Sequence, residues 1–210
     1  MFFDPAKRDK TRLPHDPFKA LIAPRPIGWI STMSLDGSVN LAPYSFFNAF
    51  SADPALIGFC SEGRKDSMSF AVETKEFVWN LATYDLRFQM NETSAPLSRG
   101  ESEFSHAGLE TLPSVLVRPP RVKESPAHME CRVVDVFQLH DMNGTALSRH
   151  LVIGQVIGIH IDDDFIDEAG IVQVPRMKPI ARCGYQDYSI LDEVFALKRP
   201  PGGGNAVGGG

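Results

Sequence analysis

Hydroxyl, amide and aromatic side chains gather in one early part of the chain, residues 27–50, around a sharp Asp36–Gly37 turn. Backbone groups on paired strands, together with such side chains, suit a flat aromatic ligand whose ring edge needs fixed hydrogen-bond partners. The candidate binding residues are Ser31, Thr32, Asn40, Ala42, Pro43, Tyr44, Ser45, Phe46 and Asn48. Phe46 or Phe47 is expected in the core instead, because neighbours on a strand point to opposite faces.

A second group of candidates stands between a buried-type strand and the start of a helix: Arg64, Lys65, Asp66 and Ser67. The first backbone N–H groups of a helix have no partner within it, and Arg64 or Lys65 could add charge-assisted hydrogen bonds, so the group suits a phosphate. The alternative is a solvated turn in which Asp66 or Ser67 caps the helix. The chain carries neither G-x-G-x-x-G nor G-x-x-x-x-G-K-[ST], so the Rossmann and P-loop classes lose their main support.

The stretch from Pro24 to Phe50 resembles the opening of the flavin reductase-like family of FMN-binding split barrels, which includes the flavoredoxins. In that family a Pro-Arg-Pro-hydrophobic strand leads to an Asn-x-Ala-Pro-x-Ser-Phe-Phe-Asn segment that lines the flavin. This chain has both without a gap, and the resemblance implies FMN as the cofactor. It also implies that Ser31 and Thr32 lie near the ribityl chain or phosphate, residues 42–45 at the ring, and residues 65–67 at the phosphate.

The C-terminal third adds two candidates through the same resemblance. Family members often end in a Pro-x-x-Arg-x-Gly-Gly-x-Tyr-Tyr-like segment close to the flavin, which here is residues 179–188, with Cys183 in place of the usual aliphatic residue. Arg182 would then stabilise negative charge on the reduced ring. The strand around His150 resembles one that brings a His close to the nicotinamide in the short-chain flavin reductases, although Arg149 stands where an Asp often precedes it. Arg182 and His150 could instead be structural.

The periodicity of the chain indicates strands joined by short turns, with helices inserted between them. Strands are expected over residues 27–33, 39–45, 55–61, 77–81, 129–140 and 149–161, and helices over residues 66–75 and 84–93. A proline cannot donate to a sheet, so Pro43 implies an edge strand or a bulge, and Asn143–Gly144 indicates a hairpin turn. The pattern favours an antiparallel barrel over a doubly wound sheet. Together with the resemblance, it predicts a mainly β fold, an antiparallel Greek-key split β-barrel of about six strands with peripheral helices.

The chain of 210 residues is expected to form one domain at residues 20–195, after an N-terminal extension at 1–19 and before a flexible tail at 196–210. A net charge of −5 without a basic face argues against nucleic acid as a partner, and no apolar run is long enough to cross a membrane. The three cysteines form no C-x-x-C pair and no metal cluster. They indicate free, mostly buried thiols in the cytoplasm and no metal site.

These observations predict an FMN-binding flavoprotein that acts as an NAD(P)H-dependent flavin oxidoreductase, transferring hydride from a nicotinamide nucleotide to FMN. Two alternatives stay open: a non-enzymatic FMN electron carrier of the flavoredoxin type, and a flavoenzyme that acts on a specific organic substrate. The resemblance further implies a homodimer with FMN at the subunit interface. Because a flavin carries its own redox chemistry, no residue is assigned as a general acid or base.

Overall fold

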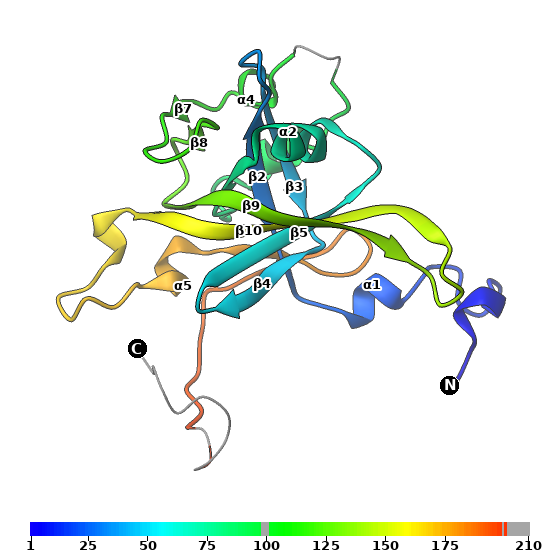
Figure 1. Cartoon of the computed structure of the whole chain (residues 1–210). Coiled ribbons are helices and arrows are strands. Elements are labelled where there is room, and N and C mark those ends of the chain that lie inside the picture. Colours follow the sequence, from blue (N-terminus) through cyan, green and yellow to red (C-terminus); the bar gives the residue numbers. More distant parts are fainter. Residues whose placement is uncertain (98–100, 199, 201–210) are drawn as a thin grey trace.

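Seven strands form the central sheet of the computed structural model, which describes residues 1–97, 101–198 and 200 (Figure 1). They are β2 (Gly28–Met33), β3 (Val39–Tyr44), β4 (Phe47–Ala52), β5 (Ala55–Glu62), β6 (Glu76–Asn80), β9 (Ala127–His140) and β10 (Ala146–Ile161). Their order across the sheet is β3-β2-β6-β9-β10-β5-β4, and every neighbouring pair is antiparallel. The predicted mainly β, antiparallel fold is confirmed.

The long hairpin of β9 and β10 joins two halves of this sheet, with β2, β3 and β6 on one side and β4 and β5 on the other (Figure 1). Its turn is the predicted one: Gly144 has a φ of 81°, and Asp141 Oδ1 accepts the N–H groups of Asn143 and Thr145 at 2.9 and 2.8 Å. Register shifts interrupt the β9–β10 pairing at three places. Such irregularities bend a strand pair, which allows one hairpin to serve both halves.

The two edge strands differ in how well the sequence predicts them. β3 lies at one edge, as the proline at position 43 implies. β4 forms the other edge and was missed, because residues 47–52 do not alternate cleanly between apolar and polar types. β4 pairs with β5 through Asn48 opposite Gly58, and it raises the count from the expected six strands to seven.

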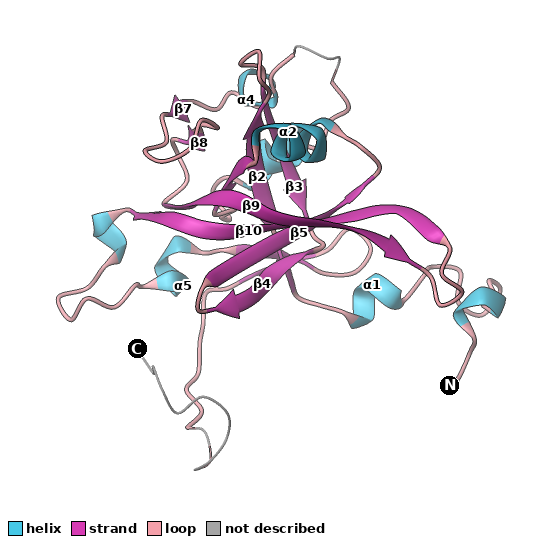
Figure 2. Cartoon of the chain, in the orientation of Figure 1, coloured by secondary structure: helices cyan, strands magenta, loops and turns pink. Residues whose placement is uncertain are grey.

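The helices are short and peripheral (Figure 2). They are η1 (Pro5–Lys7), α1 (Phe18–Leu21), α2 (Asp66–Thr74), α3 (Arg87–Glu92), α4 (Glu103–His106), η2 (Asp163–Phe165) and α5 (Val174–Met177). The predicted cap of α2 is wrong: Lys65 is the extended N-cap residue, without a side-chain bond, and Asp66 is the first helical residue. The helix predicted over 84–93 is shorter, because the N–H of Tyr84 is bonded to the carbonyl of Lys178 and so belongs to a tertiary contact.

Apolar residues pack on both faces of β2. Trp29 belongs to a cluster with Leu41, Met90 and Phe104 on one face. Its neighbour Ile30 belongs to a second cluster, with Phe59, Met68, Phe77 and Val152, beneath α2 on the other face. Both faces of this strand are therefore core.

Two small sheets complete the fold, and the sequence pattern predicted neither. β1 (Arg25–Pro26), β11 (Ile180–Arg182) and β12 (Tyr188–Ile190) form one, and β7 (Thr111–Leu112) and β8 (Arg121–Val122) form the other. In the first sheet Arg25 is the direct partner of Arg182, so the N-terminal segment and the predicted C-terminal site segment lie side by side. The proposed boundaries of the extension and the domain stay predictions, and most of the tail at 196–210 lies outside the described residues.

All three cysteines are free, as expected, but only Cys131 is buried, while Cys60 and Cys183 are half-buried. The expectation of mostly buried thiols is therefore wrong. Burial raises the pKa values of the Cys60 and Cys131 thiols, so neither is a ready nucleophile. Within the described ranges, no helix has the length and apolar character needed to cross a membrane.

Candidate functional site

A pocket of about 410 Å³ lies between edge strand β3, the start of α2 and the segment 93–97. We call it the phosphate-end pocket, after the phosphate site predicted at the helix start that lines it. The predicted binding residues that line it are Asn40, Ala42, Pro43, Tyr44, Lys65, Asp66 and Ser67. The other lining residues are Thr93, Ser94, Ala95, Pro96, Leu97 and Glu103. The structure thus brings the strand candidates and the helix-start candidates to one place.

A buried hydrogen bond connects these two groups of candidates. Asn40 Nδ2 donates to Ser67 Oγ at 2.7 Å, and both side chains are buried. Tyr44 lies on the same face of β3 as Asn40, with its ring centre 4.8 Å from that of Phe59, and its hydroxyl lies near the side chains of Ser67 and Ser61. Burial raises the pKa of the Tyr44 phenol, which therefore stays protonated near neutral pH. These contacts fix the first turn of α2 against β3.

The start of α2 offers the donors that an anion needs. The backbone N–H groups of residues 66–68 have no intrahelical acceptor, since the first bond of this turn runs from Ser69 to the carbonyl of Lys65. Lys65 lines the pocket and is exposed, so its ammonium can approach a bound phosphate. Asp66 stands at the first helical position, where a carboxylate stabilises the helix dipole. Its charge would oppose a phosphate, so we assign it to the helix.

Ser31 and Thr32 are buried on β2, but they point to opposite faces of the sheet. Thr32 pairs with Asn40 and shares the face that α2 covers, whereas Ser31 pairs with Leu41 on the other face. Neither hydroxyl has a hydrogen-bond partner within the described residues. Of these two residues, Thr32 therefore lies beside the Asn40 end of the phosphate-end pocket. Ser31 points to the Trp29 core.

A second pocket, of about 230 Å³, continues from the first, with Pro43 and Ser94 lining both. We call it the ring-end pocket, after the ring contacts predicted for Ser45 and Arg182, which line it. Its lining residues are Lys19, Arg25, Ile27, Pro43, Ser45, Met90, Ser94, Arg182, Cys183, Tyr185 and Tyr188. Ser45 and Arg182, predicted from segments that are far apart in sequence, meet here. Three lining residues are cationic and, within this described set, none is acidic, so the pocket favours negative charge.

Arg25 is the most deeply placed of these cations and was not predicted as a site residue. It is 7% exposed, and its guanidinium donates to the carbonyls of Lys19 and Ile22 and, at 2.8 Å, to that of Cys183. Its Nε is buried without a partner among the described residues. The charge is thus held by carbonyls, and no carboxylate of the described part of the chain forms an ion pair with it. Its place in the Pro24-Arg25-Pro26 run was the available sequence signal.

Arg182 is held at the mouth of the same pocket. Its guanidinium donates to the carbonyl of Tyr185, and its carbon lies 4.5 Å from the centre of the Tyr188 ring. Tyr185 itself has a φ of 55°, in the left-handed region that costs a non-glycine residue energy. The turn after β11 therefore presents Arg182 in a set orientation.

Besides Ser31 and Thr32, which also line neither pocket, four predicted residues lie outside both: Phe46, Asn48, Arg64 and His150. Phe46, Asn48 and Arg64 are exposed. His150 lies on β10 opposite Ser61, with its Nδ1 buried and unbonded within the described residues, so it faces the Tyr44 side of the sheet and not the ring-end pocket. The site roles given to these four residues stay predictions.

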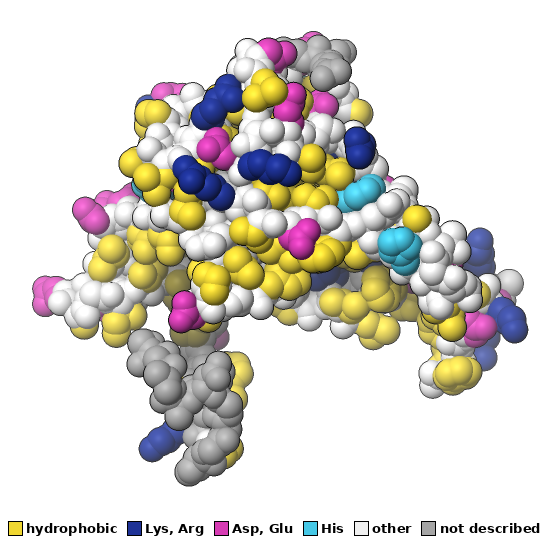
Figure 3. Space-filling model, in the orientation of Figure 1, with side chains coloured by type: hydrophobic (Ala, Val, Ile, Leu, Met, Phe, Trp, Pro, Cys, Tyr) yellow, Lys and Arg dark blue, Asp and Glu magenta, His cyan; other side chains and the backbone are white. Residues whose placement is uncertain are grey.

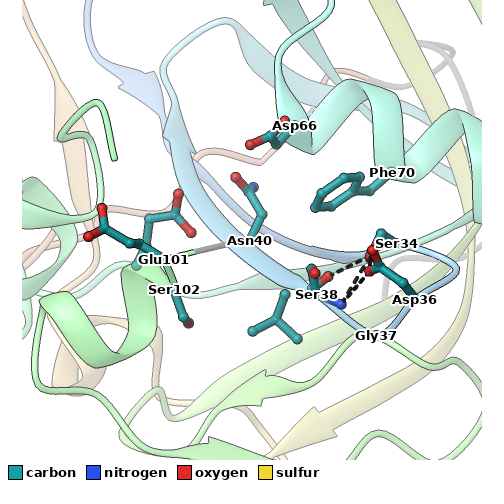
Figure 4. A pocket seen from close by; sticks show the side chains of 11 residues that line it. Ser34, Asp36, Gly37, Ser38, Asn40, Asp66, Phe70, Glu101 and Ser102 are labelled. Carbon is teal, nitrogen blue, oxygen red and sulfur yellow. Dashed lines mark hydrogen bonds between the residues drawn. The ribbon is translucent and has the colours of Figure 1, made fainter. Parts of the chain in front are cut away.

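An acidic pocket adjoins the phosphate-end pocket and shares Asn40, Asp66 and Glu103 with it (Figure 4). Figure 4 shows the Asp36–Gly37 turn on one side of this pocket and Glu101 on the opposite side. In the turn, the Ser38 N–H donates to Ser34 Oγ at 3.0 Å. Burial raises the pKa of Glu103, whose carboxylate also accepts the N–H of Leu41. Asp36 and Glu101 add two carboxylates that the phosphate-end pocket does not have, and Lys65 lines only the phosphate-end pocket, so the acidic pocket is the poorer place for a phosphate. No cluster of three metal-ligating side chains occurs among the described residues.

The family comparison agrees with this geometry. Residues 21–177, three quarters of the chain, match the model of the flavin reductase like domain. The chain belongs to this family. It is 35% identical over 193 residues to YwrF of Bacillus subtilis (strain 168), an uncharacterized protein, and the match covers 88% of this chain and 94% of that one. As a flavin reductase-like protein, the chain is a flavin-related oxidoreductase.

Solved structures show the same architecture. Nitrilotriacetate monooxygenase component B from Bacillus cereus superimposes with a TM-score of 0.84 at 29% identity, covering 94% of this chain and 98% of that one. A Shewanella frigidimarina NCIMB 400 protein described as having a split barrel domain superimposes with a TM-score of 0.81 at 22% identity, covering 95% and 100%. At 22% identity, the second match supports the fold alone. The predicted split barrel is thus confirmed.

Proposed function

We propose that this flavin reductase-like protein binds FMN along the two joined pockets and transfers hydride to it from NADH or NADPH. The observation that carries the proposal is the shared wall of Pro43 and Ser94, which makes one groove with anion donors at one end and fixed cations at the other. A mononucleotide flavin has this polarity, with a phosphate at one end and a ring edge that gains negative charge on reduction.

The residues of the chain bind and orient the flavin. The N–H groups at the start of α2, with Ser67 and Lys65, hold the phosphate. The backbone of residues 42–45, at the end of edge strand β3 and directly after it, would bind the ring edge, because an edge strand keeps unpaired backbone groups on its open side. When bound, the flavin supplies the hydride-accepting chemistry.

The cations of the ring-end pocket set the electrostatics of the reaction. Arg182 and Arg25 are both held by backbone carbonyls and have no carboxylate partner among the described residues, so their charge is available to the ligand. Preorganised positive charge near the place where negative charge develops lowers the energy of the reduced state. Two guanidinium groups therefore favour hydride acceptance.

We further propose that two chains form a homodimer around the outer face of the β4–β5 half. Phe46 and Phe50 are exposed there, and Phe137 joins them through β10, since Phe137, Leu151 and Cys60 are direct neighbours across three strands. Hydrophobic side chains gather over this part of the surface in Figure 3. An exposed apolar patch of this kind marks an interface, and a partner seated on it would bring the exposed Asn48 close to a second chain.

Two alternatives differ from the proposal in the electron donor or acceptor. An electron carrier would bind FMN without oxidising a nicotinamide nucleotide, and an enzyme for a specific organic substrate would need that substrate as acceptor.

The free thiols fit a reducing compartment, and we place the protein in the cytoplasm. The proposal includes neither nucleic acid nor a membrane as a partner.

The test is steady-state oxidation of NADH and of NADPH by the purified protein with added FMN, followed at the nicotinamide absorbance. The proposal predicts turnover that saturates with FMN and with one of the two nucleotides. FMN binding without any turnover would favour the carrier.

A further inference from the structure

A third pocket, of about 320 Å³, opens beside the ring-end pocket and shares Met90 and Tyr188 with it. We call it the aromatic pocket. Its lining residues are Tyr84, Arg87, Phe88, Met90, Asn91, Ile180, Tyr188 and Ile190. α3 supplies one wall, and β11 and β12 supply the other. The flavin site as proposed above uses none of its residues apart from the two that are shared.

The lining of this pocket is apolar except for Asn91 and one charge. Three aromatic rings, two isoleucines and a methionine form its surface. Tyr84, Phe88, Tyr188 and Ile190 are each at least 36% exposed, which is unusual for side chains of this kind that lie together. Concave sites with mostly apolar walls and a few polar groups are typical of small-molecule binding.

The single charge belongs to Arg87. Its guanidinium carbon lies 3.9 Å from the centre of the Tyr84 ring and 4.3 Å from that of the Phe88 ring, and Nη1 donates to the carbonyl of Tyr84 at 2.6 Å. Within the described parts of the chain, no carboxylate lies within ion-pair distance of it. Its other donors are therefore oriented by the two rings and remain available to a ligand.

We propose that the aromatic pocket binds a small aromatic carboxylate next to the ring end of the groove. The walls favour a flat apolar body, and the volume suits one ring with small substituents. The lone guanidinium requires one negative charge and matches a carboxylate with two parallel hydrogen bonds. The position beside the flavin rests on the proposed function, whereas the binding itself does not. A nicotinamide nucleotide fits less well, because its two or more phosphate charges would meet one cation here.

The test is isothermal titration of benzoate into the purified full-length protein, with and without excess FMN. We expect saturable binding in both conditions. Arg87→Met keeps an unbranched apolar side chain and removes the charge, so it should weaken benzoate by about tenfold or more. It should leave the weaker binding of the uncharged benzamide unchanged. Arg176→Met is the matched control, because Arg176 lies 5.7 Å from the Phe165 ring, outside the pocket.

A second variant keeps the test decisive should Arg87→Met lose its fold. Ile190→Trp at the partly exposed rim fills the pocket and should abolish the binding of both probes without changing FMN affinity. Absence of saturable benzoate binding, equal binding by Arg87→Met, or competition between benzoate and either FMN or NADH would overturn the proposal. Failure of the protein to bind FMN would overturn the flavin site, whereas benzoate binding by that same protein would still support the aromatic pocket.

Discussion

The amide of Asn40 and the hydroxyl of Ser67, 2.7 Å apart and both buried, join edge strand β3 to the first turn of α2. The two residues are 27 positions apart in the sequence and come from different elements. Their bond fixes the helix start relative to the strand that faces the proposed ring. The spacing between the anion donors and the backbone proposed to bind the ring is therefore set by the fold before any ligand arrives.

Removing this bond should affect both stability and binding. Asn40→Ala leaves the Ser67 hydroxyl without its buried donor, so the free energy of unfolding should fall by about 1–2 kcal/mol. FMN affinity should fall as well. Urea denaturation and FMN titration measure the two effects. Asn48→Ala, at an exposed position, is the control for stability, and equal unfolding curves for the two variants would contradict the role of Asn40.

Arg182 should tune the flavin and contribute little to folding. Arg182→Ala removes a cation from the ring-end pocket, so the midpoint potential of bound flavin should become more negative by about 30 mV, equivalent to about 1.4 kcal/mol. Arg182→Lys should restore only part of this, since an ammonium lacks the planar fork. Potentiometry and flavin-free thermal melting test this. An unchanged potential with a much lower melting temperature would show that Arg182 is structural.

The protein should sediment as a dimer, and a charge on the outer face of β4 should break it. Phe50 is 52% exposed there, so Phe50→Glu would desolvate a carboxylate at the interface and shift the equilibrium to the monomer. Val115→Glu, exposed on a loop that Glu130 holds through backbone bonds, is the control. Sedimentation equilibrium measures the mass. A monomeric wild-type protein that binds FMN tightly would contradict a shared site.

His128 should make the protein less stable in mild acid. Burial lowers the pKa of His128 from 6.5 to about 4, while Nε2 bonds to the carbonyl of Val122 at 2.8 Å. Between pH 6.5 and about pH 4, the unfolded chain binds a proton at His128 that the native chain does not. The free energy of unfolding therefore falls as the pH falls through this window. Replacing His128 with Gln should remove about 2–3 kcal/mol of the loss between pH 7 and 4.5. Urea denaturation between pH 7 and 4.5 measures this loss for the wild-type protein, for His128→Gln and for His140→Gln, an exposed control. If stability falls with pH equally in His128→Gln and in the wild-type protein, the assignment to His128 is contradicted.

Local signals predicted the elements that hold the site. The turns at Asp36–Gly37 and Asn143–Gly144 depend on residues within a few positions, and both hairpins follow from them. The helix start at residue 66 was also predicted, although its cap was not, because a capping side chain competes with the contacts that hold Ser67 to Asn40. Alternation likewise fails for β4, because Phe50 is exposed on its outer face while Phe47 packs against the core.

Long-range contacts account for what the sequence left out. Arg25 pairs with Arg182 across a small sheet of very short strands, and strands this short leave no periodicity to detect. The opposite faces of Ser31 and Thr32 do follow from strand geometry, but which face holds the ligand depends on where α2 packs. The aromatic pocket unites α3 with β11 and β12, some 90 residues apart, and no local pattern indicates that.

The most direct test of the proposed groove is a pair of equilibrium titrations, FMN and riboflavin, followed by quenching of flavin fluorescence. With the phosphate at the start of α2, the wild-type protein should bind FMN more tightly than riboflavin. Replacing both Arg64 and Lys65 with Ala should weaken FMN by about 1–3 kcal/mol and leave riboflavin unchanged. Equal affinities for FMN and riboflavin in the wild-type protein would contradict the assignment of the phosphate to this helix.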